Sequence, residues 1–354
     1  MSLKIVGIAG LCIAGLGTLF VACGNGSVSS SGSGSGSDGG GGNGGDGGGG
    51  PPPPGSFSIT FGPEPAPATE EHTKCVVKRL GNPNKMHVGS VHNVLSLGSH
   101  HLIVYRTNDT VEQTTPFDCK PFTDTLDPTK GSTLMISQKR DDTLQLPDGV
   151  GYTLDANQMI RLEMHYINAG SKDIVVQSTS TFIPIADAAF KFEADFLFIG
   201  TPDINIQPLS KLTVGPMFIQ LPSAYDGVNF FALTGHEHQF GTNVAVSTAT
   251  SAADPGTPVY DVPGWLWSEP KTVVASPPFQ VAAGGGFKFT CSWNNTSNAA
   301  VGFGESANNE MCFFWAYYYP SQGGARVCVH TNQIPGGADA CCPGTSVVCN
   351  FLKK

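Results

Sequence analysis

The sequence predicts an all-β protein built from two antiparallel jelly-roll β-sandwich domains in tandem. Short runs rich in β-branched and aromatic residues recur along the chain, separated by Gly, Pro, Asn and Asp turns such as Pro147-Asp148-Gly149. No stretch keeps a helical hydrophobic period over three turns. Sheets of this kind bury one face against another, which favours sandwiches. The predicted strands are 94–106, 159–168, 174–183, 192–199, 212–221, 230–234, 242–248, 272–275, 287–293 and 311–319.

The first 22 residues have the pattern of an export signal. Lys4 is the one cation before an apolar run from Ile5 to Ala22. Residues 19–23 resemble a bacterial lipoprotein cleavage box, with the small Ala22 before Cys23, which predicts lipidation of Cys23. A plain signal peptide or an uncleaved anchor remains an alternative. We therefore expect an exported lipoprotein at the outer membrane, the cell surface or in the periplasm.

We expect residues 23–55 to form a flexible tether between this anchor and a folded body. They are almost entirely Gly, Ser, Asn and Asp and close with Pro51 to Pro54, so they lack apolar side chains to offset the entropy of ordering. The remaining 300 or so residues are enough for two domains. Residues 184–189 interrupt two strand-rich halves, which predicts an N-terminal domain over 56–187 and a C-terminal domain over 188–354.

The composition limits which kinds of partner and which redox compartment fit this chain. A formal net charge of -9 with 13% charged residues leaves no basic footprint for nucleic acid. Without Cys12 in the signal and Cys23 at the anchor, the ten cysteines leave eight, an even number that favours disulfides in an exported chain. We predict a small-molecule substrate, a membrane attachment through the lipid and no protein partner.

His236 and His238 form the clearest metal-binding pattern. Residues i and i+2 of a strand point to one face, so both imidazoles can reach one ion. His100 and His101 are neighbours, which point to opposite faces of a regular strand. That pair fits one ion only where the strand is bulged or just beginning, or where the two rings use different nitrogens.

His165 and Met311 are weak signals when taken alone. A single histidine on a strand face is more often a hydrogen-bonded group, and methionine commonly fills cores. Together with the other four residues, however, they make six soft-metal ligands in order along the chain. Imidazole suits copper and zinc, and a thioether favours cuprous copper.

The segments GSHHLIVYR, LEMHYIN and GHEHQFG, followed by Asn309-Glu310-Met311-Cys312, resemble the copper type II ascorbate-dependent monooxygenases. The resemblance extends from about Cys75 to Tyr319 and implies two copper ions with ascorbate or a similar reductant as co-substrate. It implies two jelly-roll domains that face each other across a solvent-filled cleft. His100, His101 and His165 would bind an electron-relaying copper, and His236, His238 and Met311 the copper at which oxygen is activated.

The same resemblance implies two disulfides, Cys75 with Cys119 and Cys291 with Cys312, each bracing a ligand element. Cys328, Cys341, Cys342 and Cys349 lie beyond the similar region. Direct bonding of the adjacent pair is strained, so two pairings remain open for a stapled C-terminal extension.

Substrate identity does not carry over from the resemblance. Peptide-hydroxylating members have an arginine where this chain has Thr234, and an asparagine and a tyrosine where it has Phe313 and Trp315. Glu163 also replaces an amide found in those members. These differences favour an uncharged or aromatic non-peptide substrate for hydroxylation. The alternative is a copper-binding lipoprotein without catalysis, and a zinc hydrolase built on His236 and His238 is a weaker third reading.

Overall fold

The computed structural model describes residues 52–120, 131–323, 326–333 and 337–342. The predicted signal segment, Cys23, most of the predicted tether and Cys349 lie outside the described residues. Within the described part the chain is all-β apart from one 3-10 turn at Ser223–Tyr225, which confirms the predicted fold class. No described helix has both the length and the apolar character needed to cross a membrane.

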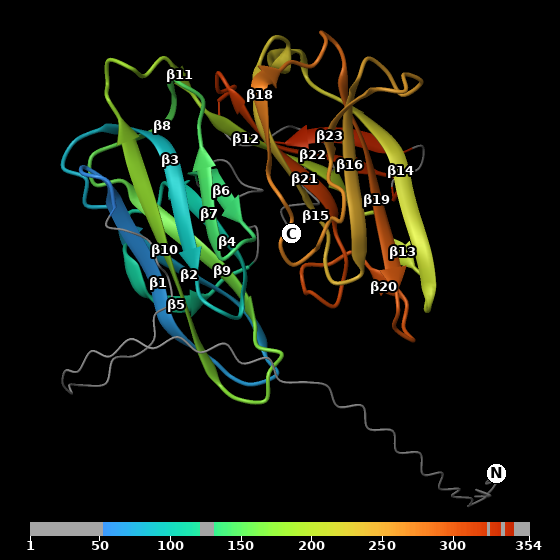
Figure 1. The fold of residues 1–354 in the computed structure, drawn as a ribbon, viewed down its shortest axis with the longest axis horizontal. Helices are drawn as coiled ribbons and strands as arrows, with labels where there is room; N and C mark the ends of the chain where they lie inside the picture. Colours follow the sequence, from blue (N-terminus) through green and yellow to red (C-terminus); the bar gives the residue numbers. More distant parts are fainter. Residues whose placement is uncertain (1–51, 121–130, 324–325, 334–336, 343–354) are drawn as a thin grey trace, which may run out of the picture. The chain divides into compact units, whose positions relative to one another are not determined.

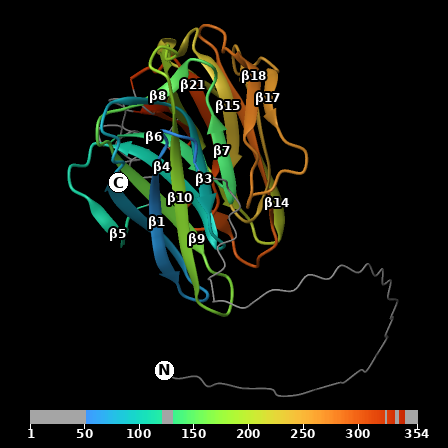
Figure 2. The same ribbon diagram turned by 60° about the vertical axis from the view of Figure 1, so that its left-hand side comes forward.

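The first half of the chain forms two facing sheets (Figure 1). One has the order β1-β10-β3-β8-β11, with β7 also paired to β3, and Figure 2 shows β1, β10 and β3 side by side. The other has the order β5-β2-β9-β4-β6. The strands are β1 (Phe57–Ala66), β2 (Glu71–Arg79), β3 (Met86–Leu95), β4 (Ser99–Thr107), β5 (Gln113–Asp118), β6 (Gly131–Ser137), β7 (Asp141–Gln145), β8 (Val150–Leu154), β9 (Met159–Ile167), β10 (Ile174–Ile185) and β11 (Phe192–Glu193).

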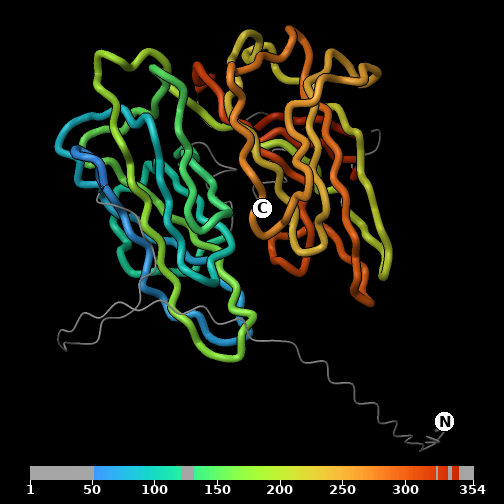
Figure 3. Tube along the Cα trace, in the orientation of Figure 1, coloured from blue at the N-terminus to red at the C-terminus, as the bar shows by residue number. Residues whose placement is uncertain are grey.

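The second half contributes two larger sheets and a small one, drawn from yellow to red in Figure 3. Their orders are β18-β15-β21-β12-β22-β23, β14-β19-β16-β17 and β13-β20. The strands are β12 (Asp195–Thr201), β13 (Asn205–Ile206), β14 (Ser210–Gln220), β15 (Asn229–His236), β16 (Gly241–Ala249), β17 (Thr257–Asp261), β18 (Val273–Phe279), β19 (Gly286–Asn295), β20 (Val301–Gly302), β21 (Cys312–Tyr319), β22 (Arg326–Thr331) and β23 (Ala338–Cys342).

The change of sheets falls between β11 and β12. The assignment of residues 56–187 and 188–354 to separate domains, and their jelly-roll connections, stay predictions. The single run predicted for residues 94–106 is two strands in the structure. A turn at Ser96 to Gly98 separates β3 from β4, and Gly98 has a φ of 85°, a conformation that glycine tolerates best.

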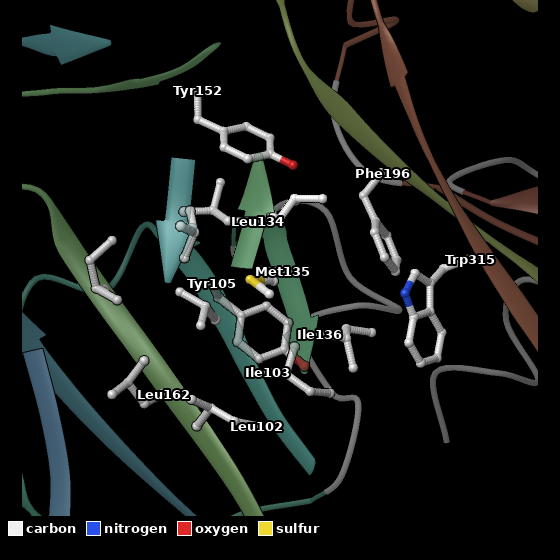
Figure 4. Packing of buried hydrophobic residues seen from close by; sticks show 14 of the residues in the cluster. Leu102, Ile103, Tyr105, Leu134, Met135, Ile136, Tyr152, Leu162, Phe196 and Trp315 are labelled. Carbon is white, nitrogen blue, oxygen red and sulfur yellow. The ribbon is translucent and has the colours of Figure 1, made fainter. Parts of the chain in front are cut away.

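The two halves share a hydrophobic core. Residues of β4, β6 and β9 belong to the same buried cluster as Phe196, Trp315 and Tyr317 from the second half, as Figure 4 shows for several of them. The backbone N–H of Ile136 donates to the hydroxyl oxygen of Tyr317 at 3.1 Å within this cluster. A separate cluster fills the space between the second half's own sheets.

The C-terminal strands are part of a sheet and not an appended extension. β22 pairs in parallel with β12, and β23 pairs with β22, where Cys328 lies opposite Cys341. These two cysteines form a disulfide, and Cys342 is also disulfide-bonded. The predicted disulfide staple is present as the Cys328–Cys341 pair, one of the two pairings left open. The strands β22 and β23 nevertheless belong to a sheet and not to a separate extension, because Val327, Cys328 and Val329 of β22 are buried.

Candidate metal centre

A β-bulge brings the adjacent histidines of the first half together. In the pairing of β4 with β9, Ser99 faces Tyr166 and His101 faces His165, so His100 is an extra residue between two paired positions. The ring centroids of His100 and His101 are 5.3 Å apart, and both rings lie within 5.1 Å of His165. This is the strand irregularity that the sequence required for the pair to share an ion.

His236 and His238 stand at the end of β15, with ring centroids 5.0 Å apart. The register of β15 with β21 places His236 opposite Phe313, two residues after Met311 in the chain. Two hydrogen bonds fix this junction, since His238 N–H donates to Glu310 Oε2 at 2.8 Å and His238 Nδ1 lies 3.2 Å from the carbonyl oxygen of Asn309. Met311 is buried.

The structure gathers the five histidines into one cluster. The ring centroid of His100 lies 6.5 Å from that of His236 and 6.1 Å from that of His238, and His101 lies 6.2 Å from His236. All five are at most 7% exposed. The solvent-filled cleft implied by the family resemblance is therefore not present between these rings. Trp315, a member of the apolar core that the two halves share, lies with its ring centroid 5.7 Å from that of His236.

Several nitrogens of the cluster fit a metal. His165 Nδ1 and His101 Nε2 are 3.2 Å apart, close to the roughly 3.3 Å expected for two nitrogens at about 2.0–2.1 Å from one tetrahedral ion. Within the described residues, the Nε2 atoms of His100 and His238 are buried without a hydrogen-bond partner. Asn309 O can only accept, so His238 Nδ1 carries the proton and Nε2 keeps its lone pair.

Burial also keeps these imidazoles in the form that binds metals. Desolvation, followed by repulsion from neighbouring histidines, lowers the pKa of His100, His101 and His236 well below its usual value. Desolvation likewise lowers the pKa of His238 to about 4. Neutral imidazole at ordinary pH is the ligand that copper and zinc require.

The described side chains of the cluster are not arranged as a complete set of metal ligands. Across the described ranges, no three or more His, Cys, Asp or Glu side chains are arranged so that they could hold a metal as they stand. Imidazole nitrogens suit copper and zinc, and the predicted thioether ligand Met311 would favour copper.

Glu71, at the start of β2, is a site residue that the sequence analysis missed. Its Oε1 lies 2.7 Å from His165 Nε2 and accepts from the N–H of Ala307 at 2.9 Å, and its Oε2 accepts from Ser306 Oγ at 3.0 Å. The bond with His165 is the main reason that the pKa of Glu71 falls to about 2. One carboxylate thus contacts a histidine of the first half and the loop before Met311.

Gln138, just after β6, was also missed. Its Oε1 lies 2.7 Å from Nδ1 of His236, so a side chain of the first half contacts a histidine of the second. Both residues are buried. Nothing in the local sequence around Gln138 marks it, because the contact depends on how the two halves pack.

Two buried carboxylates support the end of β15. Glu310 accepts hydrogen bonds from the backbone N–H groups of His238 and Phe240 at 2.8 Å each and from Trp293 Nε1 at 2.9 Å. Desolvation nevertheless raises its pKa to about 7. Glu237 accepts from Ser292 N–H at 2.9 Å, and burial followed by repulsion from Glu310 raises its pKa well above the usual value.

The residues considered for a substrate wall have other contacts. Phe313 stacks on Phe198 with centroids 4.7 Å apart, and Trp315 is buried with its ring 5.7 Å from His236. Thr234 shares a 2.8 Å hydrogen bond with Thr272. The three residues are therefore packed in the core, and the partly exposed Trp267, 5.3 Å from His100, is the aromatic ring beside the cluster that reaches solvent.

Disulfides brace both ligand elements. The structure joins Cys75 to Cys119 and Cys291 to Cys312, the two pairs that the resemblance implied. Cys75 lies in β2 opposite Glu163 of β9, and Cys312 follows Met311 directly. Glu163 itself is buried and accepts from the hydroxyl of Tyr105 at 3.0 Å.

Comparison with known proteins supports the family assignment for the second half. Residues 216–335 match the family described as copper type II ascorbate-dependent monooxygenase, C-terminal domain, which confirms the resemblance over that part of the chain. The match includes His236, His238 and Met311. No curated protein matches the chain in sequence.

Similar solved structures are remote. The major capsid protein P2 of bacteriophage PM2 is 9% identical with a TM-score of 0.33, covering 76% of this chain and 99% of that one. The cowpea mosaic virus top component is 9% identical with a TM-score of 0.28, covering 74% and 95%.

Proposed function

From the match of residues 216–335 to the copper monooxygenase domain, we propose that this protein is a copper-dependent monooxygenase. It uses O2 and a one-electron reductant such as ascorbate to hydroxylate a C–H bond of a small-molecule substrate. The family is a monooxygenase family, so this reaction type is the natural one for a chain that carries its ligand residues.

The gathering of five buried histidines is the observation that carries the proposal. These residues come from β4, β9 and the end of β15, far apart in sequence, and a fold has little reason to bury so many imidazoles together without a ligand. Nitrogens without hydrogen-bond partners at His100 and His238 are what a metal would satisfy.

We assign His100, His101 and His165 to one copper and His236, His238 and Met311 to a second. Bound copper supplies one-electron redox chemistry and the activation of O2. The chain's burial keeps the imidazoles of His100, His101, His236 and His238 neutral and excludes bulk water from them. Met311 offers a soft thioether that would stabilise the reduced ion. No acid or base from the protein is required for this assignment.

The surroundings favour an uncharged or aromatic substrate. Trp267 lies beside His100 and is partly exposed. The buried Phe313 and Trp315 make the core side of the cluster apolar. Thr234 offers no positive charge for a carboxylate. We propose that the substrate approaches along Trp267.

Burial of the cluster also favours a second candidate, a copper-binding protein without catalysis. His236 and His238 are at most 1% exposed, so O2 and substrate need an opening that storage of copper does not. For either function we propose that Cys23 is lipidated and that residues 24–55 tether the body to a membrane outside the cytoplasm.

Turnover distinguishes the two candidates. Purified protein loaded with copper and supplied with ascorbate and a library of uncharged aromatic compounds is expected to bind about two coppers and form hydroxylated product with O2 uptake. Two coppers without product across the library would support the binding protein. Selective retention of zinc with no copper would contradict both.

A further inference from the structure

The contacts of Glu71 point to a role that neither the motifs nor the family match assigns. We propose that Glu71 is a positioning residue that sets the ligand nitrogen of His165 and ties it to the loop before Met311. The inference rests on the proposed copper function, and it concerns how the two ligand sets are held together.

The first step concerns the proton on His165. Glu71 Oε1 lies 2.7 Å from His165 Nε2, and an ionised carboxylate only accepts hydrogen bonds. The proton therefore sits on Nε2. In the neutral imidazole the other nitrogen, Nδ1, then keeps its lone pair, and it is the one that lies 3.2 Å from His101 Nε2. Carboxylates that orient a ligating imidazole in this way commonly strengthen metal binding.

The second step concerns the loop of the other half. The same carboxylate accepts from Ala307 N–H and from Ser306 Oγ, at 2.9 Å and 3.0 Å. The N–H of Asn309 in turn donates to Ser306 O at 2.8 Å, and Asn309 O accepts from His238. A continuous set of hydrogen bonds thus runs from His165 through Glu71 to the residues that hold His238 and precede Met311.

The third step concerns burial and charge. His165 is 3% exposed, whereas the Glu71 side chain is 22% exposed, so the carboxylate covers the histidine on its solvent side. Its neighbour Glu70 makes a similar 2.7 Å contact with His72, but both of those side chains are at least 35% exposed. Of the two adjacent glutamates, Glu71 therefore pairs with a buried histidine and Glu70 with an exposed one. Glu70 provides the matched control.

The test compares three variants of the full exported chain, Glu71→Ala, Glu71→Gln and the control Glu70→Ala. In metal-free protein, nitrogen-15 NMR of the histidine rings is expected to show His165 protonated on Nε2 in the parent chain and in Glu71→Gln, whose amide oxygen still accepts. In Glu71→Ala the two tautomers are expected to mix. Glu70→Ala is expected to leave His165 unchanged.

Copper titration then reports the consequence. Glu71→Ala is expected to weaken Cu(II) binding at the first ligand set about 10- to 100-fold and to alter its electron paramagnetic resonance spectrum. Glu71→Gln is expected to recover most of the affinity, and Glu70→Ala to match the parent. An unchanged His165 tautomer in Glu71→Ala, or equal copper affinity in Glu71→Ala and Glu70→Ala, would overturn the inference.

The two proposals fail separately. A parent chain that binds no copper contradicts the proposed function, while the NMR tautomer of the metal-free protein still decides the role of Glu71. Should Glu71→Ala not fold, the comparison uses Ser306→Ala, which removes the hydroxyl contact alone. Ser306→Ala is expected to weaken copper binding less than tenfold, and a loss equal to that of a His165→Ala variant would contradict the arrangement.

Discussion

Gln138 Oε1 lies 2.7 Å from His236 Nδ1, and this contact joins the two halves of the chain at the candidate metal centre. Gln138 follows β6 in the first half, whereas His236 ends β15 in the second. Glu71 accepts two further hydrogen bonds from the loop before Met311, which makes three between the halves at candidate ligand residues or their supporting loop. The halves are thus connected at the cluster by polar contacts as well as by their shared apolar core.

Replacing Gln138 by leucine is expected to weaken copper binding at the set that contains His236. The amide oxygen accepts the Nδ1 proton of His236, which leaves Nε2 to face an ion. Loss of such a contact typically costs about 10- to 100-fold in metal affinity. Competition titration with a chelator measures the change, and the exposed Gln207→Leu serves as control. Equal affinities for the two variants would show that Gln138 does not orient His236.

Glu310→Ala is expected to lower the free energy of unfolding by at least about 2 kcal/mol, because three N–H donors lose their acceptor. These donors are the backbone groups of His238 and Phe240 and the indole of Trp293. Urea unfolding of the metal-free protein measures the loss. The exposed Glu269→Ala is the control. A loss below about 0.5 kcal/mol in Glu310→Ala would show that the three N–H donors do not depend on Glu310 as their acceptor.

The pH dependence of stability should report the buried histidines. Burial lowers the pKa of His238 from 6.5 to about 4. Between these values the unfolded chain binds the proton and the folded chain does not, so the free energy of unfolding falls as the pH drops from 6.5 towards 4. One such group contributes up to about 1.4 kcal/mol per pH unit.

Comparing variants isolates this contribution. In metal-free His238→Gln the fall in stability between pH 6.5 and 4 is expected to be shallower than in the parent, whereas the exposed, non-titrating control Gln207→Leu retains the parent's slope. The comparison matters because Glu310, whose pKa burial raises to about 7, has the opposite sign and loses stabilisation as the pH rises. Identical slopes in parent and His238→Gln would contradict the burial of a neutral His238.

The disulfides should stabilise the ligand elements unequally. Cys75 and Cys119 are 44 residues apart and Cys291 and Cys312 are 21 apart, so chain entropy predicts losses of about 4 and about 3.3 kcal/mol when each pair is replaced by alanines. Unfolding by guanidinium measures both. The Cys291→Ala, Cys312→Ala chain should also bind copper more weakly at the His236 set, and unchanged binding would show that the disulfide does not brace Met311.

The sequence revealed the strand-rich fold class because period-two alternation is local. It also predicted that His236 and His238 lie together, because residues two apart on a strand share a face, and their ring centroids are 5.0 Å apart. The bulge at His100 could be anticipated, since two adjacent histidines of a regular strand point to opposite faces and a bulge lets them bind one ion. Each of these inferences depends on residues close in sequence.

The missed features depend on packing between distant segments. Nothing local distinguishes Glu71 from Glu70, yet one contacts His165 and the other His72. Gln138 is 98 residues from its partner His236. The expected solvent-filled cleft was wrong because the apolar residues that join β4 and β6 to Phe196 and Trp315 look the same, in sequence, as residues buried within one sandwich.

X-ray absorption spectroscopy of the reduced, copper-loaded protein can show directly whether Met311 binds copper. We expect about two Cu(I) per chain, with copper–sulfur scattering from Met311 in addition to imidazole nitrogen. In Met311→Ile the sulfur contribution and the oxygen chemistry should disappear, while the copper held by His100, His101 and His165 remains. A reduced protein without copper–sulfur scattering, or a Met311→Ile variant with full activity, would contradict the assignment of Met311 as a copper ligand.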